Sequence, residues 1–373
     1  MSAGYAERLK EYPNKGKCGL PENYDTSRSL SSKISTLANL LNDSSYTVVL
    51  TGAGISTSAG IPDFRGPNGI WTREQERLKQ LQLMMKKKKR KRVEQESRKK
   101  KKNGDDDLME QLQDDREQQQ QKQETSNEDN LSFVTAKPTL THRALAHLIA
   151  TKKPKSNKQH HRNNKSHYHV HHLITQNIDG LHGKTPQLPR SHLSILHGDI
   201  FTEKCPTCHT EYIRNYEIST IGLQPTGRYC TNGSCQGALI DTLLDWEDAL
   251  PEKDWETSQV ECAKAELILC LGTSLRIEPA GGLCRLATTE GFLEAGADEW
   301  DLSDDGDAKE QSKKKKKGKK KQQQSTQKKL GYVIVNLQET PYDDQAALVI
   351  RAKVDDVMER LMSKLGYGSD WDT

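Results

Sequence analysis

Apolar residues gather in short runs separated by longer segments with helical spacing. The runs have the length and continuous apolar character typical of parallel strands that are covered on both faces. They lie at Thr47–Leu50, Val170–Thr175, Leu193–Leu196, Leu267–Leu271, Val333–Leu337 and Leu348–Ile350. Helices are predicted over Ser29–Leu41, Thr141–Ile149 and Val354–Leu365, the last of which Gly366 would end. This order predicts an α/β fold, a doubly wound parallel-sheet (Rossmann-like) domain.

Three biased polar segments interrupt this pattern. Residues 74–130 contain KKKKRKR, DDD and a glutamine-rich stretch, residues 151–167 are rich in Lys and His, and residues 290–329 pass from acidic to poly-lysine. With 33% hydrophobic and 29% charged residues overall, the chain cannot bury these segments in a core, so we expect surface insertions without fixed structure. Residues 74–102 lack Pro and Gly, which leaves a charged helix as an alternative for that part.

The insertions divide the foldable sequence into blocks. The N-terminal segment and the first part of the Rossmann-like domain take residues 1–73, and that domain continues over 131–199, which include the second insertion. A small cysteine-containing module is predicted at 200–241, inserted between strands. The Rossmann-like domain resumes at 242–289, and 330–373 hold its last strands and a C-terminal helix.

The distribution of charged and apolar residues also limits the cellular locations that we expect for the protein. Fifty-six basic and 52 acidic residues give a net charge of only +4, but they are clustered rather than interspersed. No stretch reaches the roughly 20 apolar residues of a membrane span, and the first residues lack the apolar run of a secretory signal. We therefore expect a soluble intracellular protein with no membrane association. Its eight cysteines are then thiols or metal ligands rather than disulfides.

A glycine loop follows the first predicted strand. Gly52-Ala53-Gly54 begins the fingerprint of a dinucleotide-binding turn, in which backbone approaches a pyrophosphate, but Thr57 stands where the third glycine belongs. Taken alone, the motif is equally compatible with an ordinary turn after a strand. The loop either is a degenerate hydride-transfer site or binds the same cofactor for a different chemistry.

Asp63-Phe64-Arg65, a few residues further on, favours a ligand site over a plain turn. Two opposite charges around an aromatic residue have little reason to occur in a core. Arg65 is suited to a phosphate or a ribose, and Phe64 to stacking on or shielding a reactive ring.

Polar residues end several other strands. Gln176, Asn177 and Asp179 follow the second strand, where they can hydrogen-bond an amide or ribose hydroxyls, or simply cap a helix. His197 follows the third strand, a position for a general base as well as for a structural histidine. Further strand-end loops contain Gly272, Thr273 and Ser274, and Asn336 and Gln338, which without the other motifs are ordinary turns.

Four cysteines form two knuckles. Cys205 and Cys208 are separated by two residues, and Cys230 and Cys235 by four, with 21 residues between the pairs. This spacing predicts a tetrahedral thiolate zinc site of structural character, since four protein ligands leave no open position for substrate. Three of the remaining cysteines, Cys262, Cys270 and Cys284, are predicted to be small core residues.

In this order, TGAGIS, GIPDFRGPNGIW, TQNIDGLH, LHG, the paired cysteines, LGTSL and IVNLQ resemble the sirtuin family. GKCGLPENYD, KPTLTH, DTLLDWEDALP and LGTSLRIEPAG are most similar to its class IV branch. The resemblance covers nearly every block outside the insertions. It implies a glycine loop that binds NAD and an enzyme that consumes it.

The resemblance implies an NAD-dependent protein lysine deacylase that releases nicotinamide and transfers the acyl group to ADP-ribose. His197, Asn177 and Asp179 would be the catalytic residues, with His197 as general base on a ribose hydroxyl. The implied NAD contacts are Gly52, Ala53, Gly54, Thr57, Asp63, Phe64, Arg65, Trp71, Gln176, Asn177, Asp179, His197, Gly272, Thr273, Ser274, Asn336, Gln338 and Val354. Trp246 and Asp248 lie in the segment that would pair with an acyl-lysine peptide, and the four knuckle cysteines would hold zinc.

The resemblance and the basic runs together favour a nuclear protein that acts on histones or other chromatin proteins. Lys86–Arg92 and Lys313–Lys321 are suited to nuclear import or to contacts with DNA phosphates on nucleosomes, although solvated low-complexity tracts look the same. Two other functions stay open: mono-ADP-ribosyl transfer to protein, and a non-catalytic scaffold that senses NAD or ADP-ribose. The sequence does not indicate which acyl group the enzyme prefers, which lysine it acts on or which oligomeric state it forms.

Overall fold

The computed structural model describes residues 9–10, 12, 15–99, 133–153, 168–288, 290 and 329–372. Its main element is a six-stranded sheet with the order β10-β9-β8-β1-β2-β3, in which every neighbouring pair is parallel. The strands are β1 (Thr47–Thr51), β2 (His172–Thr175), β3 (Leu193–Ile195), β8 (Leu267–Leu271), β9 (Gly331–Val335) and β10 (Leu348–Ile350). The predicted doubly wound sheet is confirmed.

The strand order reverses direction at β1. The chain passes from β1 outward through β2 and β3, and then returns to β8 on the other side of β1 before it continues outward to β10. Val49 of β1 pairs with Leu173 of β2 and with Leu269 of β8. Loops that leave β1, β2 and β8 therefore meet at the switch point, where open α/β sheets bind ligands.

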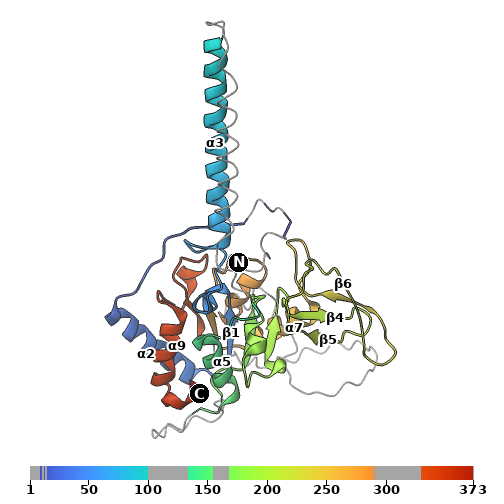
Figure 1. Cartoon of the computed structure of the whole chain (residues 1–373). Helices are drawn as coiled ribbons and strands as arrows, with labels where there is room; N and C mark the ends of the chain where they lie inside the picture. The colour runs from blue at the N-terminus through green and yellow to red at the C-terminus, as the bar shows by residue number, and fades with distance from the viewer. Residues whose placement is uncertain are drawn as a thin grey trace, which may run out of the picture.

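Helices cover both faces of the sheet because apolar side chains alternate along its strands. Val49 belongs to a cluster with α2 (Ser27–Asp43), α5 (Leu140–Ala150) and α9 (Val354–Lys364), which pack together (Figure 1). Val48 and Leu50 point to the opposite cluster, against α7 (Glu252–Lys264) and the 3-10 helix η4 (Ala280–Ala287).

The helix ends follow from local chemistry. Thr26 caps α2 by accepting a hydrogen bond from the Ser29 amide, and Leu30, Ile34, Leu37 and Leu41 recur on its buried face. After α9, Gly366 has a φ of +86° and its amide donates to the Ser363 carbonyl, as its predicted role as a helix terminator requires. The three predicted helices are confirmed to within two residues at each end.

The shorter elements complete the connections. They are α6 (Leu181–Lys184), η1 (Ala53–Ile55), η2 (Thr57–Ala59), η3 (Arg190–His192), η6 (Asp343–Gln345) and η7 (Ser369–Asp372). The predicted strand Val333–Leu337 lies two residues earlier, at Gly331–Val335.

A second, antiparallel sheet lies within residues 200–241. Its order is β5-β4-β7-β6, formed by β4 (Thr202–Lys204), β5 (Glu211–Ile213), β6 (Pro225–Tyr229) and β7 (Ala238–Asp241). The Glu203 carboxylate is fully buried and pairs with Arg214 at 2.6 Å and Arg228 at 2.5 Å, which compensates its burial. This sheet forms the separate unit seen beside the main sheet in Figure 1.

The first insertion differs from the expectation of a segment without fixed structure. Helix α3 (Ile70–Lys99) begins before the predicted boundary and continues through residue 99, extending away from the body of the molecule (Figure 1). A 30-residue helix is about 45 Å long. The charged-helix alternative therefore holds for this part. Residues 101–130, most of the second insertion (154–167) and residues 291–328, which include Lys313–Lys321, lie outside the described residues.

Candidate functional site

Three strand-end loops are joined at the switch point. The Gly54 amide, after β1, donates to the Gly272 carbonyl after β8 at 2.8 Å. The Gln176 amide, after β2, donates to the Thr51 carbonyl at 3.0 Å, and its side chain donates to Thr273 Oγ1 at 3.1 Å. These bonds bring residues that are more than 200 positions apart into one polar surface.

The loop after β1 requires glycine at positions 52 and 54 because it packs directly against the loop after β8, a reason that the sequence motif does not reveal. A Cβ on Gly52 would lie 2.7 Å from the Thr273 Cβ, and one on Gly54 would lie 2.8 Å from the Gly272 Cα. Both glycines thus allow the β1 and β8 loops to approach each other directly. Gly272 itself has a φ of +59°, a conformation that side chains disfavour.

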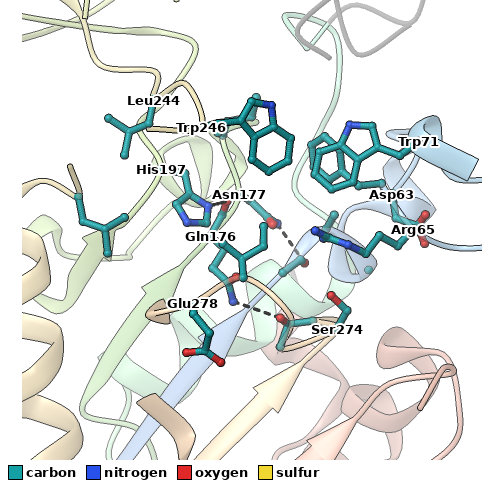
Figure 2. Close-up of a pocket in the computed structure, with 18 of the residues that line it drawn as sticks. Asp63, Arg65, Trp71, Gln176, Asn177, His197, Leu244, Trp246, Ser274 and Glu278 are labelled. Atoms are coloured by element: carbon teal, nitrogen blue, oxygen red, sulfur yellow. Dashed lines mark hydrogen bonds between the residues drawn. The ribbon is translucent and has the colours of Figure 1, made fainter. Parts of the chain in front are cut away.

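A cavity of about 580 Å³ opens between these loops and the segment that follows the small sheet (Figure 2). Most of the predicted site residues line it. They are Gly52, Ala53, Gly54, Asp63, Phe64, Arg65, Trp71, Gln176, Asn177, His197, Trp246, Asp248, Gly272, Thr273, Ser274, Asn336 and Gln338. The structure thus gathers side chains from nearly the whole length of the chain into one site.

Three predicted contacts lie outside the cavity wall. Thr57 is exposed and its hydroxyl donates to the Gly54 carbonyl at 3.2 Å. Val354 is buried in the core at the start of α9. Asp179 is also buried, where it accepts hydrogen bonds from Ser56 Oγ at 2.6 Å and from the Leu181 amide at 2.9 Å. Burial raises the pKa of the Asp179 carboxyl, which these hydrogen bonds oppose.

Asn177 connects Asp179 to the cavity. Its side-chain amide donates to the Gly52 carbonyl at 3.2 Å and to Ser56 Oγ at 3.3 Å, and that hydroxyl in turn donates to Asp179. A buried network in which each member has a partner holds its side chains in one orientation. Asp179 therefore acts on the cavity indirectly, through Ser56 and Asn177.

His197 lies beside Asn177 at the cavity, half-buried (Figure 2). Its Nδ1 lies 3.0 Å from the Gln176 carbonyl oxygen. Burial lowers the pKa of the imidazole, partly opposed by this hydrogen bond, and the Arg65 charge lowers it further. The next residue, Gly198, packs its backbone directly against Thr242, because a Cβ there would lie 1.9 Å from the Thr242 carbonyl oxygen.

An aromatic wall faces His197. The Phe64 and Trp71 rings lie 4.7 Å apart, Trp71 and Trp246 lie 5.1 Å apart, and the Arg65 guanidinium sits 4.4 Å above the Trp71 ring. Burial lowers the pKa of Arg65 to about 10, so this side chain remains charged at neutral pH. Its Nε donates to the Lys15 carbonyl at 3.0 Å, which leaves the other guanidinium nitrogens toward the cavity side.

Sequence reasoning missed part of the wall. The additional lining residues are Leu9, Gly66, Ile178, Leu244, Asp245, Ala249, Leu250, Glu252, Trp255, Ile277, Glu278 and Pro279. Several belong to the motifs DTLLDWEDALP and LRIEPAG, which marked the region but not the individual residues. No sequence motif marked Leu9 as a site residue, because its place in the wall depends on where the N-terminal segment crosses the cavity.

The four knuckle cysteines converge in the small sheet. Their sulfur atoms all lie within 4.8 Å of one another, with Cys205 and Cys235 at 3.6 Å and Cys208 and Cys230 at 3.5 Å. A tetrahedral ion with metal–sulfur bonds of about 2.3 Å places its ligands about 3.8 Å apart. The cluster therefore fits a closed thiolate zinc site, well suited to a structural role. By contrast, Cys262, Cys270 and Cys284 are fully buried core residues, as predicted.

A model of the Sir2 family matches residues 52–132 and 104–279, the span that contains the three loops, His197 and the cysteine cluster. The chain belongs to the Sir2 (sirtuin) family. NAD-dependent protein deacetylase SRT1 of Arabidopsis thaliana is 37% identical over 98% of this chain. NAD-dependent protein deacetylase Sirt6 of Drosophila melanogaster is 32% identical over 98% of this chain and 86% of that protein. NAD-dependent protein deacetylase sirtuin-7 of Bos taurus is 31% identical over 92% and 62%.

This sirtuin spans about half the length of the plant proteins it matches, 56% of SRT1 of Arabidopsis and 54% of SRT1 of rice. Its motifs resemble those of sirtuin six, and the Drosophila relative is named Sirt6. Among the described residues, no helix combines the length and the apolar character needed to cross a membrane.

Proposed function

We propose that this sirtuin is an NAD-dependent protein lysine deacylase that transfers the acyl group to ADP-ribose. The observation that carries the proposal is the placement of His197 and Asn177 on one cavity together with the β1 and β8 glycine loops. The relatives named above are NAD-dependent protein deacetylases, which supports the same reaction class.

The polar half of the cavity fits NAD. The Gly52–Gly54 turn lines the cavity, Arg65 supplies a charge for phosphate, and the Asn336 and Gln338 loop supplies polar groups for a ribose. Asn177 would serve the nicotinamide amide. When bound, NAD supplies an electrophilic ribose carbon and nicotinamide as the leaving group.

Different residues around the cavity would move a proton, position Asn177 and exclude water. His197 takes a proton from a ribose hydroxyl through Nε2, because Nδ1 is committed to the Gln176 carbonyl. Asp179 and Ser56 hold Asn177 in place, and Phe64 with Trp71 excludes water from the reacting face. The cysteine cluster would hold a structural zinc ion that stabilises the small sheet.

The protein substrate would bind beside Trp246 and Asp248. Leu244, Leu250 and Trp255 give this side of the cavity an apolar lining suited to an acyl chain, acetyl and longer groups included. A peptide would pair with this segment through its backbone, as an added strand.

We further propose nuclear location and histone or other chromatin substrates. The Lys86–Lys91 run lies exposed on the projecting helix α3, where an import receptor or nucleosomal DNA phosphates can reach it. Replacing these six residues with Gln should shift a fluorescent fusion toward the cytoplasm. Unchanged nuclear accumulation would remove this run as the import signal.

Mass spectrometry after incubation with NAD and acetyl- or myristoyl-lysine histone H3 peptides tests the reaction. Release of nicotinamide with O-acyl-ADP-ribose is expected, with a loss of about a hundredfold or more in a His197→Tyr variant. ADP-ribose attached to protein would instead indicate mono-ADP-ribosyl transfer. NAD binding without turnover of peptides or nucleosomes would favour a scaffold.

A further inference from the structure

The N-terminal segment crosses the mouth of the cavity. We call its described residues, Leu9, Lys10, Tyr12 and 15–25, the N-terminal strap. The strap is fixed at one end to the sheet, where the Asp25 amide donates to the Arg351 carbonyl at 2.7 Å and the Asn23 amide to the Leu337 carbonyl at 2.8 Å. Further along, the Gly19 amide donates to the Arg65 carbonyl at 3.0 Å. These bonds direct the remaining residues across the site.

The far end of the strap lies on the segment to which we assign substrate binding. The Lys10 amide donates to Asp245 Oδ1 at 3.3 Å, and the Tyr12 ring stacks on the Trp246 ring at 4.6 Å with an interplanar angle of 14°. Leu9 lines the cavity itself. The chain's own residues thus lie along Asp245 and Trp246 in the place where a substrate peptide would lie.

Lys10 is the lysine of the strap that pairs with a residue of the cavity wall. Its Nζ lies 3.7 Å from Asp245 Oδ2, and Asp245 lines the cavity. The Lys10 side chain is 76% exposed, so it is open to acylation by an acyl thioester, in which the lysine amine displaces the thiol. Acylation removes the positive charge and with it the ion pair to Asp245, which frees the side chain to turn inward.

We propose that Lys10 is an intramolecular substrate: once acylated, it is deacylated by the same chain that contains it. The inference rests on the proposed function and names a substrate for that site. The amide C–N bond of acyl-Lys10 and the glycosidic C–N bond of NAD break, and the amide nitrogen returns as the lysine amine. One water is consumed, the acyl carbon is esterified to a ribose oxygen, and nicotinamide leaves with its bonding electron pair.

Tethering gives this reaction its kinetic signature. An acyl-lysine held at the mouth of its own site has an effective concentration in the millimolar range, which does not change when the protein is diluted. An exposed lysine far from the cavity must instead be deacylated by a second molecule. Lys364, exposed near the end of α9, offers that comparison.

The test uses the full chain with Nε-acetyl-lysine introduced at position 10 or, as the matched control, at position 364. Each protein is incubated with NAD and an acetylated H3 peptide in the same tube, and mass spectrometry follows each acetyl group. We expect loss of the acetyl group at position 10 with a rate constant that is unchanged over a tenfold dilution. Loss at position 364 should be at least about tenfold slower and should scale with concentration.

Three outcomes would overturn the proposal. Retention of the acetyl group at position 10 while the peptide is deacylated would refute self-deacylation and leave the proposed function intact. A rate at position 10 that scales with concentration would show deacylation between molecules. Turnover of neither group would refute the proposed function as well. Tyr12→Ala, which removes the stacking on Trp246, should slow loss at position 10 more than loss from the peptide; equal effects would contradict the role of the strap.

Discussion

The Nδ1 atom of His197 lies 3.0 Å from the backbone carbonyl oxygen of Gln176. A carbonyl can only accept a hydrogen bond, so Nδ1 bears the proton and Nε2 is the basic nitrogen of the neutral ring. The same backbone that presents the Gln176 side chain to Thr273 therefore selects the tautomer of His197. Gln176, at the end of β2, thus holds His197 through its backbone carbonyl and Thr273 of the β8 loop through its side chain.

The pH profile should reflect the environment of His197. Burial lowers the pKa of the imidazole, and general-base catalysis needs the neutral form, which predominates above that pKa. We expect the acid limb of kcat/KM for an acyl peptide to fall below about pH 6.5, the usual histidine value. A limb clearly above that value would show that His197 is not the group that titrates.

Asp199 should make the fold less stable as the pH rises. Burial raises the pKa of its carboxyl to about 6 from 3.8, so between these values the folded state binds more protons than the unfolded state. Stability contributed by the protonated form is therefore present below about pH 4 and is lost as the pH rises through about 6.

Asp199→Asn should remove the fall in folding stability that the Asp199 carboxyl causes as the pH rises. The amide oxygen can still accept from the Phe201 amide, a bond of 2.8 Å in the wild type, so we expect a gain of about 1–3 kcal/mol in unfolding free energy at pH 8 and little at pH 4. Urea unfolding across this range measures the difference. Asp344→Asn, at an exposed carboxyl, is the control, and an equal gain in both variants would contradict the explanation.

Gly54→Ala should damage the fold as well as cofactor binding. Its Cβ would lie 2.8 Å from the Gly272 Cα, and backbone on both sides cannot move aside cheaply, so we expect a loss of about 1–3 kcal/mol in stability. The KM for NAD should rise too. Gly183→Ala meets only the Asp199 carboxylate at 3.9 Å and should be tolerated, as thermal unfolding of both variants would show.

Cys208→Ser should release the metal. With one of four thiolates lost, we expect zinc content to fall from one ion per chain toward zero and the thermal midpoint to drop, since structural zinc sites contribute folding free energy directly. Elemental analysis and circular dichroism measure both effects. Cys262→Ala, in the core, should keep its zinc. Full zinc occupancy in Cys208→Ser would exclude the four-cysteine site.

Local sequence predicted the six strands of the main sheet and the helices α2, α5 and α9, because their signals are short-range, but not α7 or the individual strands of the small sheet. Continuous apolar runs such as Leu267–Leu271 mark strands buried on both faces, and the spacing of Leu30, Ile34, Leu37 and Leu41 marks a helix with one buried face. The paired cysteines predicted their own cluster, since a tetrahedral site requires that spacing. The motifs placed the candidate residues at strand ends without showing how those ends meet.

Tertiary structure decided which of these residues share a cavity. Asp179 is only two residues from Asn177, yet it lies outside the cavity wall and acts through Ser56. Leu9 and Lys10 have no motif, and their place beside Asp245 arises only because the strap is anchored to Arg351 and Leu337. The sequence by itself determined the strands of the main sheet, three of its helices and the four candidate metal ligands, which depend on neighbours a few residues away. Contacts between residues more than 200 positions apart, such as Lys10 and Asp245, depend on the packing of the whole sheet, and only the folded chain brings them together.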